Sequence, residues 1–181
     1  PDHRGIDVAL LYRKGRFYPL EVQSFRLILH DAEGKRKYTR DQLVVSGLLD
    51  QEEIHLLVNH WPSRGGAALE SRTYRKEAAL RQRYLVDSLL YHLPGAKIIS
   101  MGDFNDNPTD HSLQILTGGR GAKGRPDPQN LFNPLTRTFS KGVGSLAYRD
   151  RWSLFDQILF SRAWLFPEKG TYQFWKAGIF C

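Results

Sequence analysis

The segment IISMGDFNDNP, at residues 98–108, places a largely apolar run directly before Gly102 and a cluster of Asp and Asn side chains. A short apolar run bounded by Gly and Pro is typical of a buried strand, and the Gly and Pro mark where the chain leaves the sheet. We therefore expect a buried strand that opens into a loop carrying Asp103 and Asn105. Polar groups held at a strand end are well placed to form an active site.

A second stretch, VNHWPSR at residues 58–64, repeats this arrangement after the apolar run at 54–57. Proline lacks an N–H and stops regular strand pairing, so the polar residues lie where the strand leaves the sheet. Asn59, His60 and Arg64 are therefore candidate site residues. Each also has a structural alternative, because a strand-end histidine is often hydrogen-bonded to its surroundings, and Asp or Asn beside Gly and Pro usually makes a turn.

The rest of the chain predicts an α+β fold. Residues 71–93 carry apolar side chains at spacings of three, four and seven, which predicts an amphipathic helix that Pro94 and Gly95 stop. Residues 110–116 are expected to form a short helix and residues 118–128 a surface loop. The other expected strands are residues 6–12, 24–30, 42–49, 53–59 and 153–161, with 42–49 and 53–59 forming a hairpin pair.

Composition limits the class of protein. At 181 residues, with 41% hydrophobic and 12% aromatic residues, the chain suits one globular domain with a buried core. The formal net charge of +7 favours an anionic partner such as a phosphate ester or nucleic acid, although a basic loop such as 118–130 is more often simply solvated. A single cysteine, Cys181, excludes an internal disulfide framework and a multi-cysteine zinc site. No stretch approaches the roughly 20 apolar residues of a membrane span.

Two aspartates interrupt apolar runs. Asp156 lies in the middle of SLFDQILFS, and because burying an unpaired carboxylate is costly, we expect it to have a partner. Asp7 interrupts IDVALLY near the start of the chain. We expect either that Asp7 faces His60 across neighbouring strands and holds its ring, or that it bonds to nearby backbone.

Three ordered motifs, VNHWPSR, MGDFNDNP and WSLFDQILFS, resemble those of the endonuclease/exonuclease/phosphatase superfamily, whose fold is deoxyribonuclease-like. RGIDVALLYR and NHWPSR together resemble its bacterial branch of hypothetical nucleases. The resemblance covers nearly the whole chain and implies two packed β-sheets flanked by helices, in a four-layer sandwich. It also implies that residues 1–181 form a single, partial domain, without counterparts of the N-terminal metal-site strands and the C-terminal Ser-Asp-His motif.

The resemblance implies roles for individual residues. Asp103 would orient or deprotonate the attacking water, and Asn105 would hold a phosphoryl oxygen. His60 would contact the scissile phosphate or assist proton transfer, and Asp156 would orient a second histidine. The expected substrate-binding residues are Arg40, Asn59, Arg64 and Asp7, and the expected ligands of a Mg²⁺ or Mn²⁺ cofactor are Asp103 and Asn105. Oxygen ligands suit Mg²⁺, and cationic donors neutralise the charge that develops when water attacks a phosphoester.

The expected function is metal-dependent phosphoester hydrolysis by a monomer, with a nucleic acid phosphodiester, of DNA or RNA, as the leading substrate. A small-molecule or lipid-headgroup phosphatase or phosphodiesterase is the second hypothesis. A non-catalytic domain that binds nucleic acid through its basic surface is the third. The presence of His60, Asp103, Asn105 and Asp156 together favours an enzyme. The missing motifs predict that the isolated chain hydrolyses little, since catalytic groups that act as a unit lose most of the rate when one is removed.

Overall fold

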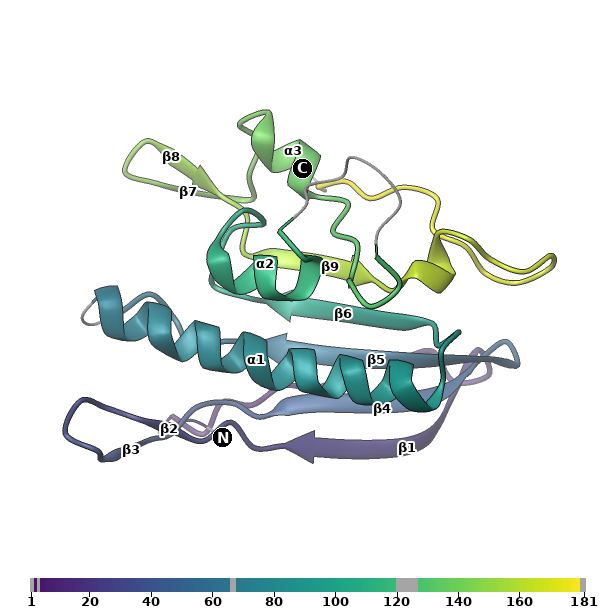
Figure 1. The fold of residues 1–181 in the computed structure, drawn as a ribbon, viewed down its shortest axis with the longest axis horizontal. Coiled ribbons are helices and arrows are strands. Elements are labelled where there is room, and N and C mark those ends of the chain that lie inside the picture. The colour runs from purple at the N-terminus through teal and green to yellow at the C-terminus, as the bar shows by residue number, and fades with distance from the viewer. Residues whose placement is uncertain (1, 3, 66–67, 120–126, 180–181) are drawn as a thin grey trace.

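The computed structural model describes residues 2, 4–65, 68–119 and 127–179, and its central feature is a mixed five-stranded sheet (Figure 1). Only the central pair, β5 and β6, is parallel, and the other pairs are antiparallel. In sheet order the strands are β1 (Phe17–Phe25), β4 (Gln42–Leu49), β5 (Glu52–His60), β6 (Ile98–Asp103) and β9 (Asp156–Phe160). Two short ribbons pair β2 (Leu29–His30) with β3 (Arg36–Lys37) and β7 (Leu146–Tyr148) with β8 (Arg151–Ser153).

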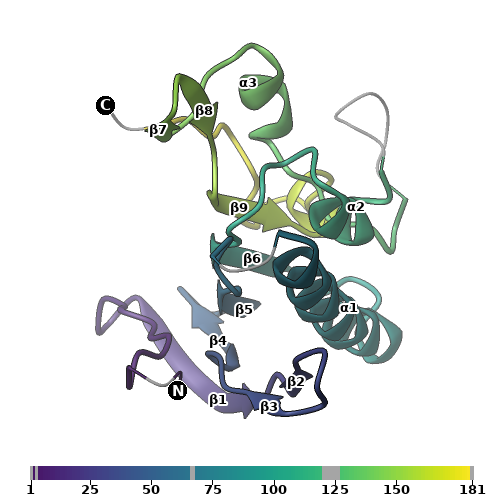
Figure 2. The same cartoon turned by 90° about the vertical axis from the view of Figure 1, so that its left-hand side faces the viewer.

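Helices cover one face of this sheet. The long helix α1 (Ala68–His92) connects the parallel strands β5 and β6, as a parallel pair requires, and α2 (His111–Thr117) packs beside it (Figure 2). Further along the chain come α3 (Thr136–Ser140) and the 3₁₀ turn η1 (Arg162–Trp164). The core under α1 and α2 contains Leu57, Ile98, Tyr74, Ala78, Val86 and Leu113.

The opposite face of the sheet is also apolar. Its buried cluster contains Phe17, Val45, Ile54, Leu56, Phe160 and Trp164. Leu10 and Phe174 pack against this cluster from segments without regular secondary structure. The central strands are therefore apolar on both sides, which explains why their sequences read as nearly continuous hydrophobic runs.

The α+β class is confirmed, and so are the main elements around the site. The expected hairpin is formed by β4 and β5, and Asp50 and Gln51 at its turn have positive φ values of 47° and 73°. The helix ends at His92, two residues before Pro94, which is consistent with the expected stop at Pro94 and Gly95. In the part of the chain that the structure describes, no helix is long and apolar enough to cross a membrane.

Four expectations differ from the structure. The expected strand 153–161 is divided between β8 and β9, and Asp156 begins β9. Residues 6–12 are not a strand: they have no ladder partner among the described strands, and Leu11 is 95% exposed. The first strand is instead β1, which begins after the turn at Gly15, while the expected strand 24–30 is divided between β1 and β2. Of the two packed sheets expected, the described residues form one five-stranded sheet with two short ribbons. Residues 120–126 of the expected loop lie outside the described residues.

Gly102 allows β6 to run close beside β5 where both strands end. Its φ is 135°, and a Cβ built at this position would lie 1.9 Å from the carbonyl oxygen of Asn59. Only glycine fits this close approach without moving the backbone. The approach sets the register in which Asn59 pairs with Gly102 and His60 with Asp103.

Candidate active site

Three adjacent strands bring His60, Asp103 and Asp156 to one end of the sheet. His60 ends β5, Asp103 ends β6 and Asp156 begins β9, and the register pairs Asp103 with both of the others. Side chains at paired positions lie on the same face of a sheet. The His60 Nε2 and the Asp103 Oδ2 are 3.8 Å apart, and about a third of each side chain is exposed, 32% and 34%. A histidine and two carboxylates therefore meet at a surface that a substrate can reach.

Asn105 joins this group through the loop that follows β6. Its backbone N–H donates to the Asp103 Oδ1 at 2.8 Å, and its φ is 51°, a left-handed conformation that asparagine tolerates. Its side-chain amide donates to the carbonyl oxygen of Trp61 at 3.0 Å. Asn105 is buried, so the loop after β6 is fixed against the end of β5.

Trp61 explains why β5 ends in the sequence NHWP. Its side chain is 1% exposed and packs edge-to-face on Phe104, with ring centroids 4.8 Å apart. Its indole N–H donates to the Asn59 Oδ1 at 3.2 Å. Because successive strand residues point to opposite faces, Asn59 faces the interior while His60 faces the site. The buried side chain of Trp61 therefore holds the end of β5 against the protein interior.

Asn59 is not at the substrate surface, which corrects the expected substrate-binding role. It is 3% exposed, and its amide donates to the Leu57 carbonyl oxygen at 3.1 Å and to the Ser100 Oγ at 3.2 Å. These bonds tie β5 to β6 behind the site. The sequence predicted that Asn59 lies at this strand end, but it did not predict on which face of the sheet the side chain lies.

Arg40 is also buried, although a substrate-binding role was expected for it. It is 5% exposed, and its guanidinium donates to the carbonyl oxygens of His60 at 3.1 Å and Trp61 at 2.7 Å. Asp2 lies 3.4 Å from the same guanidinium. Arg40 therefore holds the backbone beneath the imidazole and acts as a support of the strand end.

For Asp7, the structure favours the backbone-bonded alternative. Asp7 is exposed, and its Oδ1 accepts a hydrogen bond from the Val8 N–H at 2.9 Å. Among the ion pairs of the described residues, the carboxylate partner of His60 is Asp103.

Asp156 is exposed, which corrects the expectation of a carboxylate buried in an apolar run. The alternation of β9 buries Gln157 and Leu159 instead. The pKa of Asp156 is raised, first by partial loss of solvent and second by the neighbouring Asp103, while His60 opposes the shift. Asp103 and Asp156 thus repel each other, and a cation would relieve the repulsion.

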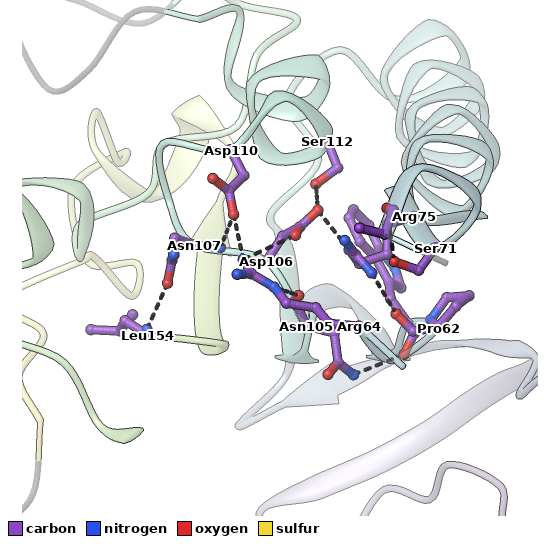
Figure 3. Close-up of polar contacts among 12 residues, drawn as sticks. Pro62, Arg64, Ser71, Arg75, Asn105, Asp106, Asn107, Asp110, Ser112 and Leu154 are labelled. Carbon is purple, nitrogen blue, oxygen red and sulfur yellow. Dashed lines mark hydrogen bonds and ion pairs between the residues drawn. The ribbon is translucent and has the colours of Figure 1, made fainter. Parts of the chain in front are cut away.

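Arg64 connects the site to a polar network that the sequence did not predict (Figure 3). Its Nε donates to the Asn105 carbonyl oxygen at 2.8 Å, and its Nη2 reaches Asp106 at 3.1 Å and Asp110 at 2.6 Å. Its guanidinium also lies over the Phe155 ring, 4.5 Å from the centroid. Arg64 is partly exposed, and its substrate-binding role stays a prediction.

Asp106 is the buried centre of this network (Figure 3). Arg75, which is 2% exposed, places its Nε 2.8 Å from the Asp106 Oδ2, and the Ser112 hydroxyl donates to the same oxygen at 2.6 Å. A buried carboxylate needs partners of this kind. The available signal was Arg75, a cation on the buried face of the helix.

The described residues contain no group of three or more His, Cys, Asp or Glu side chains arranged to hold a metal ion. Asp103 and Asp156 nevertheless offer two adjacent carboxylates. Mg²⁺ commonly keeps several waters and binds proteins through one or two carboxylates. The donors present therefore fit a weakly held, water-rich Mg²⁺, with Asp156 as a ligand candidate beside the expected Asp103 and Asn105.

Burial lowers the pKa of His60, and the nearby Arg40 lowers it further, while Asp103 opposes the shift. The imidazole is therefore mainly neutral at pH 7. In metal-free buffer, an NMR titration of the His60 ring is expected to have its midpoint below 6.5, the ordinary value. Because the unfolded chain then binds this proton more tightly, the His60 contribution to stability is lost as pH falls from about 6.5 through the folded pKa.

Asp103→Asn supplies the control for this titration. Removing the carboxylate that raises the pKa should move the His60 midpoint further down. A midpoint at or above 6.5 in the unaltered protein, or an upward movement in Asp103→Asn, would contradict the electrostatic description.

A family model described as "Endonuclease/Exonuclease/phosphatase family" matches residues 1–181. The chain belongs to this family. The superfamily resemblance read from VNHWPSR, MGDFNDNP and WSLFDQILFS is thus confirmed, and members of the endonuclease/exonuclease/phosphatase family hydrolyse phosphoesters. Comparison with curated proteins gave no match.

Solved structures share the fold of this family member. The human Nocturnin catalytic domain with bound sulfate anion matches with a TM-score of 0.57 and 16% identity, over 82% of this chain and 49% of that one. Truncated TDP2 from Caenorhabditis elegans matches with a TM-score of 0.53 and 15% identity, over 81% and 54%. A mannosyl-6-phosphatase from Bacteroides thetaiotaomicron matches with 0.51 and 18%, over 83% and 55%. The chain spans about half the length of these structures, and at such identities the likeness shows the fold alone.

Proposed function

We propose that this chain carries part of the active site of a metal-dependent phosphoester hydrolase, with a nucleic acid phosphodiester as the leading substrate. The observation that carries the proposal is the meeting of His60, Asp103 and Asp156 on three adjacent strands. A protein that only binds nucleic acid has no need of such a group. The same proposal includes membership of the bacterial nuclease-like branch of the family and a monomeric state.

Each residue has a role that its surroundings permit. The Asp103 Oδ2 faces the site, so it can orient a water molecule or accept its proton, while Oδ1 is held by the Asn105 N–H. A neutral His60 can donate one ring N–H to a phosphoryl oxygen or pass a proton. The Asn105 amide uses one N–H on Trp61 and has a second to offer.

A Mg²⁺ or Mn²⁺ ion held by Asp103, with Asn105 and Asp156 as further oxygen donors, would neutralise charge on the phosphoester. The negative charge of a phosphodiester repels nucleophiles, and the chain contributes its own positive groups near the site. Arg64 is partly exposed at the edge of the site, and Arg40 lies behind His60. Both raise the local positive potential.

A small-molecule phosphatase is the second candidate, and a lipid-headgroup phosphoester belongs to the same class. The observation that favours it is the shared fold with the mannosyl-6-phosphatase, at a TM-score of 0.51. The net charge of +7 favours the nucleic acid substrate instead, since a polyanion gains more from distributed positive charge than a single phosphate does.

The test is hydrolysis of plasmid DNA, a single-stranded oligonucleotide, bis-p-nitrophenyl phosphate and mannose 6-phosphate, each with Mg²⁺, Mn²⁺ or a chelator. It is run on the 181-residue chain and on the full gene product that contains this chain. We expect metal-dependent cleavage of the phosphodiesters by the full product and much weaker turnover by the chain. Turnover confined to mannose 6-phosphate would move the assignment to the phosphatase candidate, and no turnover of any substrate would refute hydrolysis.

A further inference from the structure

A pocket of about 770 Å³ lies beside the candidate active site, between the first turns of α1 and the start of α2. Its charged and imidazole-bearing lining differs from the apolar lining of a typical small-molecule cavity. The described residues of this kind that line it are Arg64, Arg72, Arg75, Lys76, Asp106, Asp110 and His111.

The two carboxylates of this pocket are already compensated within the protein (Figure 3). Asp106 is bound by Arg75, Arg64 and the Ser112 hydroxyl. Asp110 accepts the Arg64 Nη2 at 2.6 Å and the Asn107 N–H at 2.8 Å. An incoming ligand therefore meets carboxylates whose charge is largely neutralised.

Arg72 and Lys76 supply the charge that is not compensated. They are exposed and lie four residues apart on α1, so like charges occupy neighbouring positions on one helix face. None of the ion pairs formed within the described ranges includes either residue. Such a pair disfavours the helix by itself, and a negatively charged ligand between the two groups would reverse the effect.

The pocket adjoins the active site in sequence and through Arg64. Asn105 is fixed beside His60 by its bond to Trp61, and the next residue, Asp106, faces the pocket. Arg64 contacts both sides, because its Nε binds the Asn105 carbonyl oxygen and its Nη2 binds Asp106. A substrate extending from the strand ends over Arg64 would place its next anionic group at Arg72 and Lys76.

We propose that this pocket is an anion subsite that binds a second phosphate group of the substrate, adjacent to the phosphate that is cleaved. The inference rests on the proposed function and narrows it, because a substrate that fills both sites carries more than one phosphate. The phosphate of a neighbouring nucleotide and a free phosphate share the chemistry that the pocket recognises. The two sources are separated by experiment.

The experiment measures binding of a fluorescein-labelled eight-nucleotide single-stranded DNA by anisotropy in a buffer containing chelator, so that no hydrolysis occurs. The double variant Arg72→Gln/Lys76→Gln is expected to weaken binding about tenfold, since contacts between ionised groups are the strong ones. The slope of log K against log salt should fall by about 0.7, because one phosphate contact is lost and each such contact on a single strand contributes about 0.7.

Arg13→Gln/Lys14→Gln is the matched control, because it removes the same formal charge from exposed positions. These residues lie a few positions before β1, whose start pairs with Leu49 at the end of the sheet opposite His60. The control should leave affinity within about twofold, since distant exposed charges are screened. Equal weakening by both double variants would reduce the effect to net charge and overturn the subsite.

A second arm titrates inorganic phosphate by calorimetry. If Arg72→Gln/Lys76→Gln weakens phosphate binding but leaves oligonucleotide binding unchanged, the pocket holds a free phosphate and the substrate subsite is overturned. If neither ligand is affected, the anion site itself is overturned. Neither arm requires turnover, so a protein that binds through Arg72 and Lys76 but never hydrolyses a phosphoester would refute the proposed function while leaving the anion site supported.

Discussion

Asp103→Asn is expected to lower kcat for metal-dependent phosphoester hydrolysis by about 10²- to 10⁴-fold, the range that a positioned acid–base group contributes. The substitution keeps the shape of the side chain and the Oδ1 acceptor for the Asn105 N–H. It removes the negative charge next to His60 and Asp156 and one oxygen ligand for the metal. The loss should therefore fall on kcat, measured with bis-p-nitrophenyl phosphate and Mg²⁺ on the full gene product.

Asp87→Asn is the matched control for this measurement. Asp87 is exposed on α1 and pairs with Arg83 one turn away, far along the helix from the site. Its removal changes net charge equally but touches none of the strand ends, so activity should stay within about twofold, as expected of exposed sites. Comparable activity in Asp103→Asn and the unaltered protein would exclude Asp103 from the catalytic group.

The elements that position the site were predictable because their signals are local. The apolar run before Gly102, the proline after Trp61 and the three-and-four spacing of α1 are each read within a short window of sequence. Adjacent strand ends follow once β5 and β6 are joined by a crossover helix. The meeting of His60 and Asp103 could therefore be foreseen.

The sequence did not predict which of these side chains face the substrate. Asn59 and Arg40 lie in the expected neighbourhood, but both are buried and hold backbone groups of the strand end. Their orientation depends on strand alternation counted from a fixed register, and the register depends on long-range pairing. The exposure of Asp156 was not predicted for a related reason. The first residue of an apolar strand can remain at the surface.

Residues 6–12 also show that local sequence does not determine which segments pair in a sheet. Their composition favours a strand, but a strand forms only where a neighbouring chain supplies hydrogen bonds. The position beside β4 is occupied by β1, which carries less obvious strand signals, including Pro19 at a register shift. Local propensity therefore identified a segment that can be extended without establishing that it pairs.

Trp61→Ala is expected to reduce the free energy of unfolding by about 3–5 kcal/mol, the usual cost of removing a large buried aromatic side chain. Trp61 is 1% exposed, packs on Phe104 and donates its indole N–H to Asn59. Its loss would leave a cavity beneath the strand end and free the Asn59 Oδ1 of its partner. Urea unfolding followed by circular dichroism gives the change in stability.

Trp175→Ala separates this effect from the general consequence of deleting a tryptophan. Trp175 is 81% exposed, so its removal should alter stability by no more than about 0.5 kcal/mol. Trp61→Ala should also lower activity at temperatures where it remains folded, because the Trp61 carbonyl oxygen is the shared acceptor of Arg40 and Asn105. The backbone that presents that oxygen would then lose the packing that fixes it beside His60. A Trp61→Ala protein as stable as Trp175→Ala would show that the strand end is held by the polar contacts of Arg40 and Asn105 without help from the buried ring.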